Sequence, residues 1–193
     1  MKPCGKIAAL ALLLTGCRAP WTVRALADVD AASTSSQPFD AARFVDSVWQ
    51  SKAVPAAGNA GSFAAWRASG MQRAALVAGQ GRVLRVDSSG PLLVVDLPPF
   101  DGRAELAVRL GEIHGSTLRD ALPFIQFSQF VNQVEFARVS SALNERAATD
   151  AARALGARPA AGALIRFSGV ASAPVDAGLP ELIPILLSRE SAQ

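Results

Sequence analysis

The chain has 193 residues, half of them hydrophobic and 18% charged, with two cysteines, one histidine and no tyrosine. This composition predicts a signal segment plus roughly one packed domain, and it argues against general disorder. It excludes a disulfide scaffold, a cysteine/histidine zinc site and most histidine-based chemistry, and no apolar run reaches the roughly 20 residues of a spanning helix.

The formal charge of +3 overstates how basic we expect the mature protein to be. Two of its 19 basic residues, Lys2 and Lys6, lie in an N-terminal segment that we expect to be removed, which leaves the rest nearly balanced against 16 acidic residues. The remaining basic groups are interspersed with acidic ones. Nucleic-acid binding is therefore not expected.

The N-terminus has the three parts of a bacterial lipoprotein signal. Lys2 and Lys6 are positive, residues 7–14 form an apolar run too short to span a bilayer, and Leu14-Thr15-Gly16-Cys17 follows at once. The two small residues give a peptidase access to the bond before Cys17. The freed cysteine can then carry diacylglycerol and further acyl chains such as palmitate, which hold a protein on a membrane durably.

These features predict three segments: a signal peptide over 1–16, the lipidated Cys17 with a flexible tether over 17–38, and a single domain over 39–193. The alternative is ordinary cleavage after Ala25-Leu26-Ala27, which would release a soluble protein, but charged residues and a proline separate that site from the apolar run. The expected location is the periplasmic face of a bacterial membrane. Arg18 follows the cysteine where an aspartate would suggest inner-membrane retention, so inner and outer membranes both stay open.

Two helices are predicted at the start of the domain. The first begins near Asp40, which can cap it, and ends at Pro55 and Gly58; a second, short helix is expected over 61–69. The apolar residues of the first helix recur at helical spacing and share one face: Ala41, Phe44, Val45, Val48 and Trp49.

From Met71 the hydrophobic period changes to two, which predicts strands. The first strand is long, with Gly79 and Gly81 suggesting a bulge or sharp coil, and Pro184 places the last strand at an edge or a bulge. The inward residues expected are Leu76, Leu84 and Val86 in the first strand and Leu106, Val108 and Leu110 in the third. The strands are predicted over 74–87, 92–97, 105–110, 163–170 and 182–188.

Residues 115–155, between the third and fourth strands, are predicted to be helical and irregular. Ser116 or Thr117 can cap a short helix that Pro123 limits, and a longer helix is expected over 141–155 with Gly156 as its stop. Between these two helices, helical spacing relates Phe127, Phe130, Val131 and Val134.

The element order predicts a mainly β fold with α-helices. Five strands with a helix between the third and fourth is the order of the OB-fold, a small Greek-key barrel. We therefore expect a five-stranded OB-fold-like Greek-key barrel, with an N-terminal helix and with helices between strands 3 and 4.

The segment 115–137, from Gly115-Ser-Thr-Leu-Arg-Asp through Val-Glu-Phe-Ala137, resembles the bacterial predicted periplasmic lipoprotein family of unknown function. Three other parts of the chain are similar to the same family: residues 39–49, Gly81-Arg-Val-Leu-Arg-Val-Asp87 and the Cys17 motif. The resemblance therefore covers nearly the whole chain. It implies an OB-fold, no established activity and a context beside sugar-type ABC transporters. The turn Pro98-Pro99-Phe100-Asp101-Gly102 departs from the more acidic, glycine-rich turn that the family leads us to expect.

The polar cluster in that segment is a candidate groove for a ligand or partner. Arginine and carboxylate could orient a polar ligand while phenylalanines stack on its apolar face, as in sugar binding. The alternative is structural, with these polar groups bonding to each other and to the backbone. The residues are Arg119, Asp120, Phe124, Phe130, Asn132, Gln133 and Glu135.

No other constellation predicts catalysis or metal binding. His114 is expected to be a surface or hydrogen-bonded structural residue, and Asp96, Asp101 and Glu105 to be solvated turn carboxylates rather than cation ligands. We expect no enzyme activity, no cofactor and no metal.

The sequence thus favours a membrane-anchored binding or adaptor module. Its expected partners are the membrane through the N-terminal lipid, a protein of the cell envelope such as a transporter component, and a small polar ligand. A purely structural envelope scaffold without a ligand is the alternative.

Overall fold

A computed structural model describes residues 38–87, 92–157, 159–174 and 178–190. The predicted signal peptide, Cys17 and the tether lie outside the described residues, as do residues 88–90 of the turn predicted after the first strand. Within this description, residues 39–193 group into one compact unit. None of the described helices is both long enough and apolar enough to cross a membrane.

Five strands close into a barrel, as the sequence predicts. The sheet order is β1-β2-β3-β4-β6-β5, and β2 also pairs with β5, which closes the ring formed by β2 to β6. Neighbouring strands are antiparallel except β4 with β6 and the two-residue β1 with β2. The bounds are β1 Gly61–Ser62, β2 Ala75–Asp87, β3 Leu92–Asp96, β4 Leu106–Arg109, β5 Leu164–Ser172 and β6 Glu181–Arg189.

The long strand β2 joins both sides of the barrel because it pairs with β5 along its first part and with β3 along its second. It must coil sharply between them, and side chains from the neighbouring strands fill the space at its two interior glycines. A Cβ on Gly81 would lie 2.2 Å from Val95 Cγ1, and one on Gly79 would lie 2.7 Å from Phe167 Cζ. Glycine is therefore required at Gly81 for close approach rather than for a turn.

The single inward face predicted for β2 is wrong at Leu76 and at Leu84, whereas Val86 packs into the barrel as predicted. The register shifts between Val83 and Arg85, so Leu84 occupies a β-bulge and the alternation changes phase there. Val83 is buried in the barrel interior, Val86 packs beside it, and Leu76 packs instead beneath the helices. A single strand period carried across the bulge cannot place these three residues on one face.

The predictions for the third and last strands are confirmed. Leu106 and Val108 of β4 are fully buried in the barrel and Leu110 packs against them. In β6 the register shifts around Pro184, which lies opposite Gly169. The proline, which has no N–H to donate, thus occupies an irregular position of the ladder.

The N-terminal helix begins where predicted but continues through Pro55. Asp40 Oδ1 accepts a hydrogen bond from Arg43 N at 3.0 Å and caps α2 (Ala41–Val48). A π-helical turn, η1 (Trp49–Ala53), then leads into α3 (Val54–Gly58), in whose first turn Pro55 is placed. The helical backbone is continuous from η1 into α3, so Pro55, which has no N–H to donate, interrupts the hydrogen-bond ladder beside the π-helical turn without ending the element. The short helix predicted next is α4 (Phe63–Ala68), with Ser62 as its cap.

The connection between β4 and β5 contains a short helix, a 3₁₀ turn and a long helix. These are α5 (Thr117–Asp120), η2 (Phe127–Gln129) and α6 (Gln133–Leu155). The long helix begins eight residues before its predicted start, because Asn132 caps it, and it ends at Gly156 with a φ of 62°. The helical spacing predicted over 127–134 is wrong, since the backbone is extended at Phe130.

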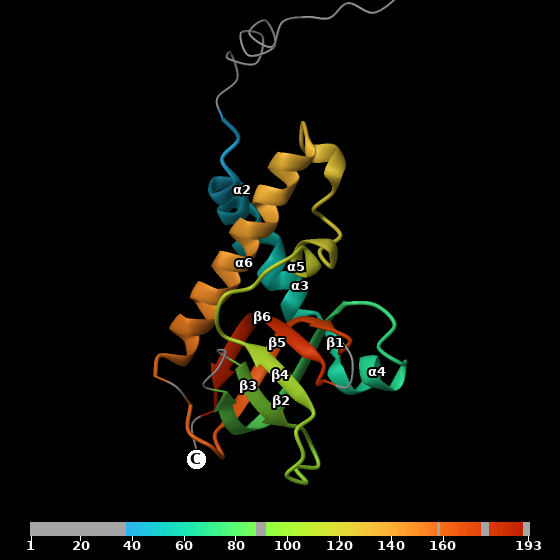
Figure 1. The fold of residues 1–193 in the computed structure, drawn as a ribbon, viewed down its shortest axis with the longest axis vertical. Helices are drawn as coiled ribbons and strands as arrows, with labels where there is room; N and C mark the ends of the chain where they lie inside the picture. The colour runs from blue at the N-terminus through green and yellow to red at the C-terminus, as the bar shows by residue number, and fades with distance from the viewer. Residues whose placement is uncertain (1–37, 88–91, 158, 175–177, 191–193) are drawn as a thin grey trace, which may run out of the picture. The chain divides into compact units, whose positions relative to one another are not determined.

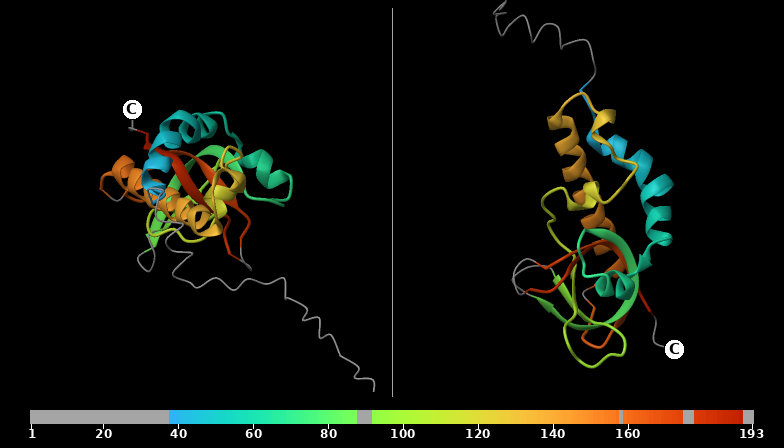
Figure 2. Two further views of the ribbon diagram at one scale, coloured as in Figure 1. Left: turned by 90° about the horizontal axis from the view of Figure 1, so that it is seen from above. Right: turned by 90° about the vertical axis from the view of Figure 1, so that its right-hand side faces the viewer.

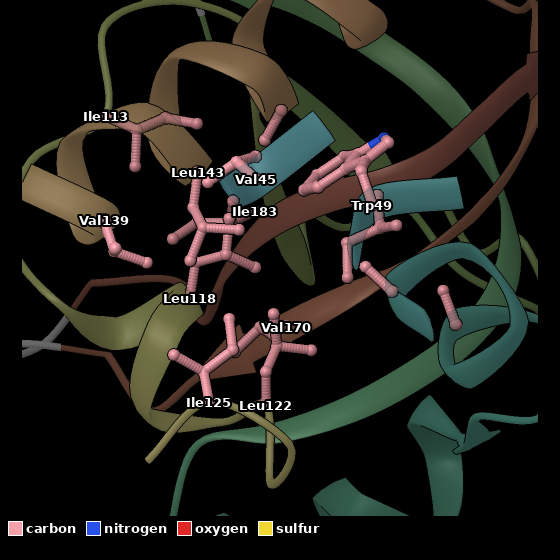
Figure 3. Close-up of a cluster of buried hydrophobic side chains, with 14 of the residues drawn as sticks. Val45, Trp49, Ile113, Leu118, Leu122, Ile125, Val139, Leu143, Val170 and Ile183 are labelled. Carbon is pink, nitrogen blue, oxygen red and sulfur yellow. The ribbon is translucent and has the colours of Figure 1, made fainter. Parts of the chain in front are cut away.

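Two buried clusters hold these layers together. One cluster fills the barrel interior. The other lies between the barrel and the helices α2, η1, α3, α5 and α6. Figures 1 and 2 show this helical layer at one end of the barrel. Figure 3 shows the second, which we call the interlayer cluster. Its members include Val45, Trp49, Leu118, Leu122, Val139, Leu143, Val170 and Ile183.

Leu143 provides a test of the interlayer cluster because it is fully buried at the middle of α6. Leu143→Ala should lower the free energy of unfolding by about 2–5 kcal/mol, the usual cost of a cavity in a packed core. Val134→Ala is the matched control on the same helix: its side chain is 60% exposed, so stability should stay within about 0.5 kcal/mol. Chemical denaturation of both variants measures this, and equal midpoints would contradict the assigned packing.

Candidate functional site

Arg119 and Asp120 form a compact ion pair on α5. Arg119 Nε donates to Asp120 Oδ1 at 2.8 Å, and its guanidinium lies 3.6 Å from the ring centre of Phe136. Arg119 Nη1 also donates to the Phe136 carbonyl at 3.2 Å, and only 13% of its side chain is exposed. The arginine therefore fastens α5 to the first turns of α6.

Asn132 and Glu135 cap the N-terminus of α6. Asn132 Oδ1 accepts from Glu135 N at 2.9 Å, and Glu135 Oε2 accepts from Val131 N at 3.1 Å. These are the bonds that the structural alternative predicted for the pair. Gln133, the first residue of the helix, is exposed.

The two phenylalanines of the predicted groove have different surroundings. Phe130 is buried among the rings of Phe39, Phe44 and Phe136, with ring centres 5.2–5.5 Å apart. Phe124 is partly buried against the interlayer cluster, and Lys52 Nζ lies 5.8 Å from its ring centre. The structure thus brings Arg119, Phe130 and Phe136 together, while a ligand groove over 119–135 stays a prediction.

The remaining titratable residues that the sequence singled out lie apart from this cluster. His114 is a surface residue, with 75% of its side chain exposed and Glu112 Oε2 at 3.9 Å from its Nε2. Asp96 is fully buried, and its Oδ2 accepts from Gly102 N at 3.1 Å. The expectation of a solvated carboxylate is wrong for Asp96, because the turn after β3 folds back over it. Among the described residues no three or more acidic, histidine or cysteine side chains gather as a metal site would require.

A cleft that the sequence did not predict lies beside the barrel. Its volume is about 670 Å³, which is within the range of small-molecule sites. The helix α4 forms one wall, and β2, β5 and the start of the β3–β4 turn form the others. Most lining residues are apolar or small: Phe63, Ala64, Ala68, Ala78, Gly79, Leu97, Pro98 and Phe167.

The polar side chains that line the cleft include Arg67, Glu105 and Gln80. Arg67 of α4 pairs with Glu105, whose other oxygen accepts from Leu97 N at 3.0 Å. This pair bridges α4 to the strand turn across the cleft. About half of the Arg67 side chain is exposed, so part of its five-donor guanidinium faces solvent. Gln80, exposed at the rim, adds an amide.

The cleft depends on close packing at Gly79. Because a Cβ at this position would meet the Phe167 ring at 2.7 Å, the glycine lets the ring lie against the strand backbone, where both residues line the cleft. The glycines of this strand are visible in the sequence, where they predict a bulge or a sharp coil of the strand. Nothing in the linear pattern relates them to α4 or to Glu105.

Comparison with known proteins gives a family and a fold. A family model described as predicted periplasmic lipoprotein (DUF2291) matches residues 7–188. No curated protein matches the sequence significantly. Among solved structures, an OB-fold protein from Thermotoga maritima is similar, with a TM-score of 0.62 and 15% sequence identity over 80% of this chain and all of that one. This likeness confirms the OB-fold architecture and carries no function.

The pKa of the Asp120 carboxyl lies below its ordinary value of 3.8. Its partial burial raises the pKa, but hydrogen bonds from Ser116 and Arg119 and the guanidinium charge lower it by more. Because the folded pKa is the depressed one, the stabilisation by Asp120 is complete above pH 3.8 and is lost as the pH falls through the folded pKa.

Ser116→Ala should raise the pKa of Asp120 towards its ordinary value. The Ser116 hydroxyl donates to Asp120 Oδ2 at 2.6 Å and makes no capping bond to the helix, so the helix itself should persist. A carbon-detected NMR titration of the carboxyl group measures the change. An Asp120 pKa that stays the same in the variant would contradict the role assigned to the hydroxyl.

Proposed function

Because the chain belongs to the predicted periplasmic lipoprotein family, we propose that it is a lipid-anchored binding module of the cell envelope. Cys17 is the proposed site of acylation. Support comes from the positive start, the eight-residue apolar run and the small residues before the cysteine. Loss of the signal would remove Cys4, so Cys17 would be the only cysteine of the mature chain.

The observation that supports binding most strongly is the cleft between α4 and the barrel. Its apolar wall and its short set of polar groups match the general composition of small-molecule sites. Its volume of about 670 Å³ would accommodate a monosaccharide or a ligand of similar size. The cleft therefore replaces the 119–135 cluster as our first candidate for the binding site.

The chemistry of the lining favours a ligand with one apolar face and several oxygen groups. The small residues Ala64 and Ala68 of α4 leave room for an apolar face. Ligand hydroxyl or carboxylate oxygens could accept hydrogen bonds from Arg67 and from the Gln80 amide, while Glu105 already has partners for both oxygens. Sugars and sugar acids have this pattern.

An accessory role beside a sugar-type ABC transporter is the specific form of this proposal. It rests on the resemblance stated above and on a cleft lining that suits a sugar. A structural scaffold would need no ligand, so a binding measurement distinguishes the two.

A thermal-shift screen against hexoses, pentoses and uronic acids tests the cleft. At a ligand concentration about 100-fold above Kd, binding adds about 2.7 kcal/mol and should raise Tm by roughly 5–10 °C. Ala64→Leu fills the cleft from its α4 wall and should abolish the shift. Ala65→Leu, on the same helix but not on the cleft wall, should preserve it.

Two results would count against this function. If none of the sugars raises Tm at millimolar concentration, sugar binding fails and the scaffold is favoured. If Ala64→Leu and Ala65→Leu retain the same shift, the ligand binds somewhere other than this cleft.

A further inference from the structure

Three large apolar side chains are exposed within one eight-residue segment of the domain. Within residues 127–134, which we call the tip, Phe127 is 49% exposed, Val131 88% and Val134 60%. The tip lies at the N-terminal end of α6, beyond the barrel (Figure 1). Single exposed apolar residues are common, whereas a group of this kind marks an interaction surface.

The tip is held in place by contacts beneath it. The Phe127 ring packs edge-on against Phe136 at 5.4 Å, and Phe130 is buried between that same ring and the rings of Phe39 and Phe44. The Asn132 and Glu135 caps fix the backbone around Val131 and Val134. The apolar groups are therefore presented to the outside by an ordered scaffold.

The domain receives its N-terminal segment beside this same surface. Phe39, at the start of the compact unit, packs against Phe130 with ring centres 5.5 Å apart. Only 21 residues separate it from Cys17. At about 3.3–3.6 Å per residue, that chain places the acylated cysteine within roughly 75 Å of the tip.

We propose that the tip is a second membrane contact, in which Phe127, Val131 and Val134 enter the interface of the bilayer that holds the acylated Cys17. The proposal rests on acylation of Cys17, and the anchor keeps the tip near that bilayer. Exposed apolar residues supported by nearby cations suit a lipid interface, and Arg138, one turn beyond Val134, is exposed.

The nearby charges are compatible with an anionic lipid surface. The Arg43 side chain is 86% exposed and lies 3.7 Å from Asp40, which also caps α2. The Glu135 carboxylate accepts the Val131 N–H and so faces the backbone. Figure 1 shows α4 beside the barrel and away from the tip. With the tip in the interface, the cleft that α4 lines is left accessible from the periplasm.

A site-specific fluorophore tests the contact in the full acylated protein. Because Cys17 is consumed by acylation, Val131→Cys supplies the single free thiol for the environment-sensitive dye NBD. The control is Ala65→Cys on α4, which is also exposed. Both proteins are reconstituted into vesicles of phosphatidylethanolamine and phosphatidylglycerol, with and without doxyl-labelled lipid as a quencher, and flotation of the vesicles reports the anchor separately.

The expected result is a blue-shifted emission at position 131 and at least threefold stronger quenching by doxyl lipid than at position 65. Adding Val134→Asp to the Val131→Cys protein should reduce this quenching by at least half, because a carboxylate resists entry into the interface. Since Val134 is exposed, this change leaves the core intact.

Three results would overturn the contact. Equal quenching at both positions in a protein that floats shows that the anchor acts without the tip. A blue shift at position 131 without lipid quenching shows that the tip packs against another copy of this chain instead of lipid. A protein that does not float lacks the anchor, and the contact that rests on it fails as well.

Discussion

The packing of α6 against both α2 and the barrel is the interaction on which the rest of the structure depends. Val139, Leu143 and Ala147 of α6 lie in the interlayer cluster with Trp49, while Leu155 at its other end belongs to the barrel interior. The Trp49 indole also donates to Asp150 Oδ2 at 2.9 Å, and the same oxygen accepts from Arg146 Nε. One helix thus joins the two hydrophobic clusters, so the helical layer and the barrel are expected to unfold together.

This arrangement separates two surfaces with different chemistry. At about 1.5 Å per residue, the 23 residues of α6 span about 35 Å, which sets the tip apart from the barrel. The apolar tip stands at the N-terminal end of α6, close to the point where the chain enters the domain. The cleft uses α4 and three barrel segments instead. The two proposals therefore place the membrane contact at the tip and the ligand in the cleft, on separate parts of the domain.

Much of the architecture could be predicted because its signals are local. Each of four signals determines the backbone of its own segment, and the structure has all four as expected. They are Asp40 at the start of the first helix, the alternation in β4, Gly156 after the long helix and Pro184 in the last strand. The errors have local causes as well. A bulge at Leu84 reverses the side-chain alternation, and the extended backbone at Phe130 interrupts a spacing that otherwise fits a helix.

The candidate sites were harder to predict because tertiary structure creates them. The cleft joins Arg67, Gly79 and Glu105, which only the closure of the barrel brings together. By contrast, Asn132 and Glu135 were noticed as a polar cluster within one segment, and their hydrogen bonds are those of a helix cap. Polar residues close together in the sequence therefore indicated a binding site where the structure has a helix cap. The cleft could not be found in this way, because its residues are far apart in the sequence.

Hydrogen exchange of the intact domain tests most directly whether α6 unites the helical layer with the barrel. The amides of Val139, Leu143 and Ala147 should exchange only through global unfolding, with the same free energy as those of Ile165 and Val170 in β5. Exchange of the α6 amides at free energies several kcal/mol below those of β5 would contradict the account. The helix would then open independently of the barrel and could not hold the tip in a fixed place.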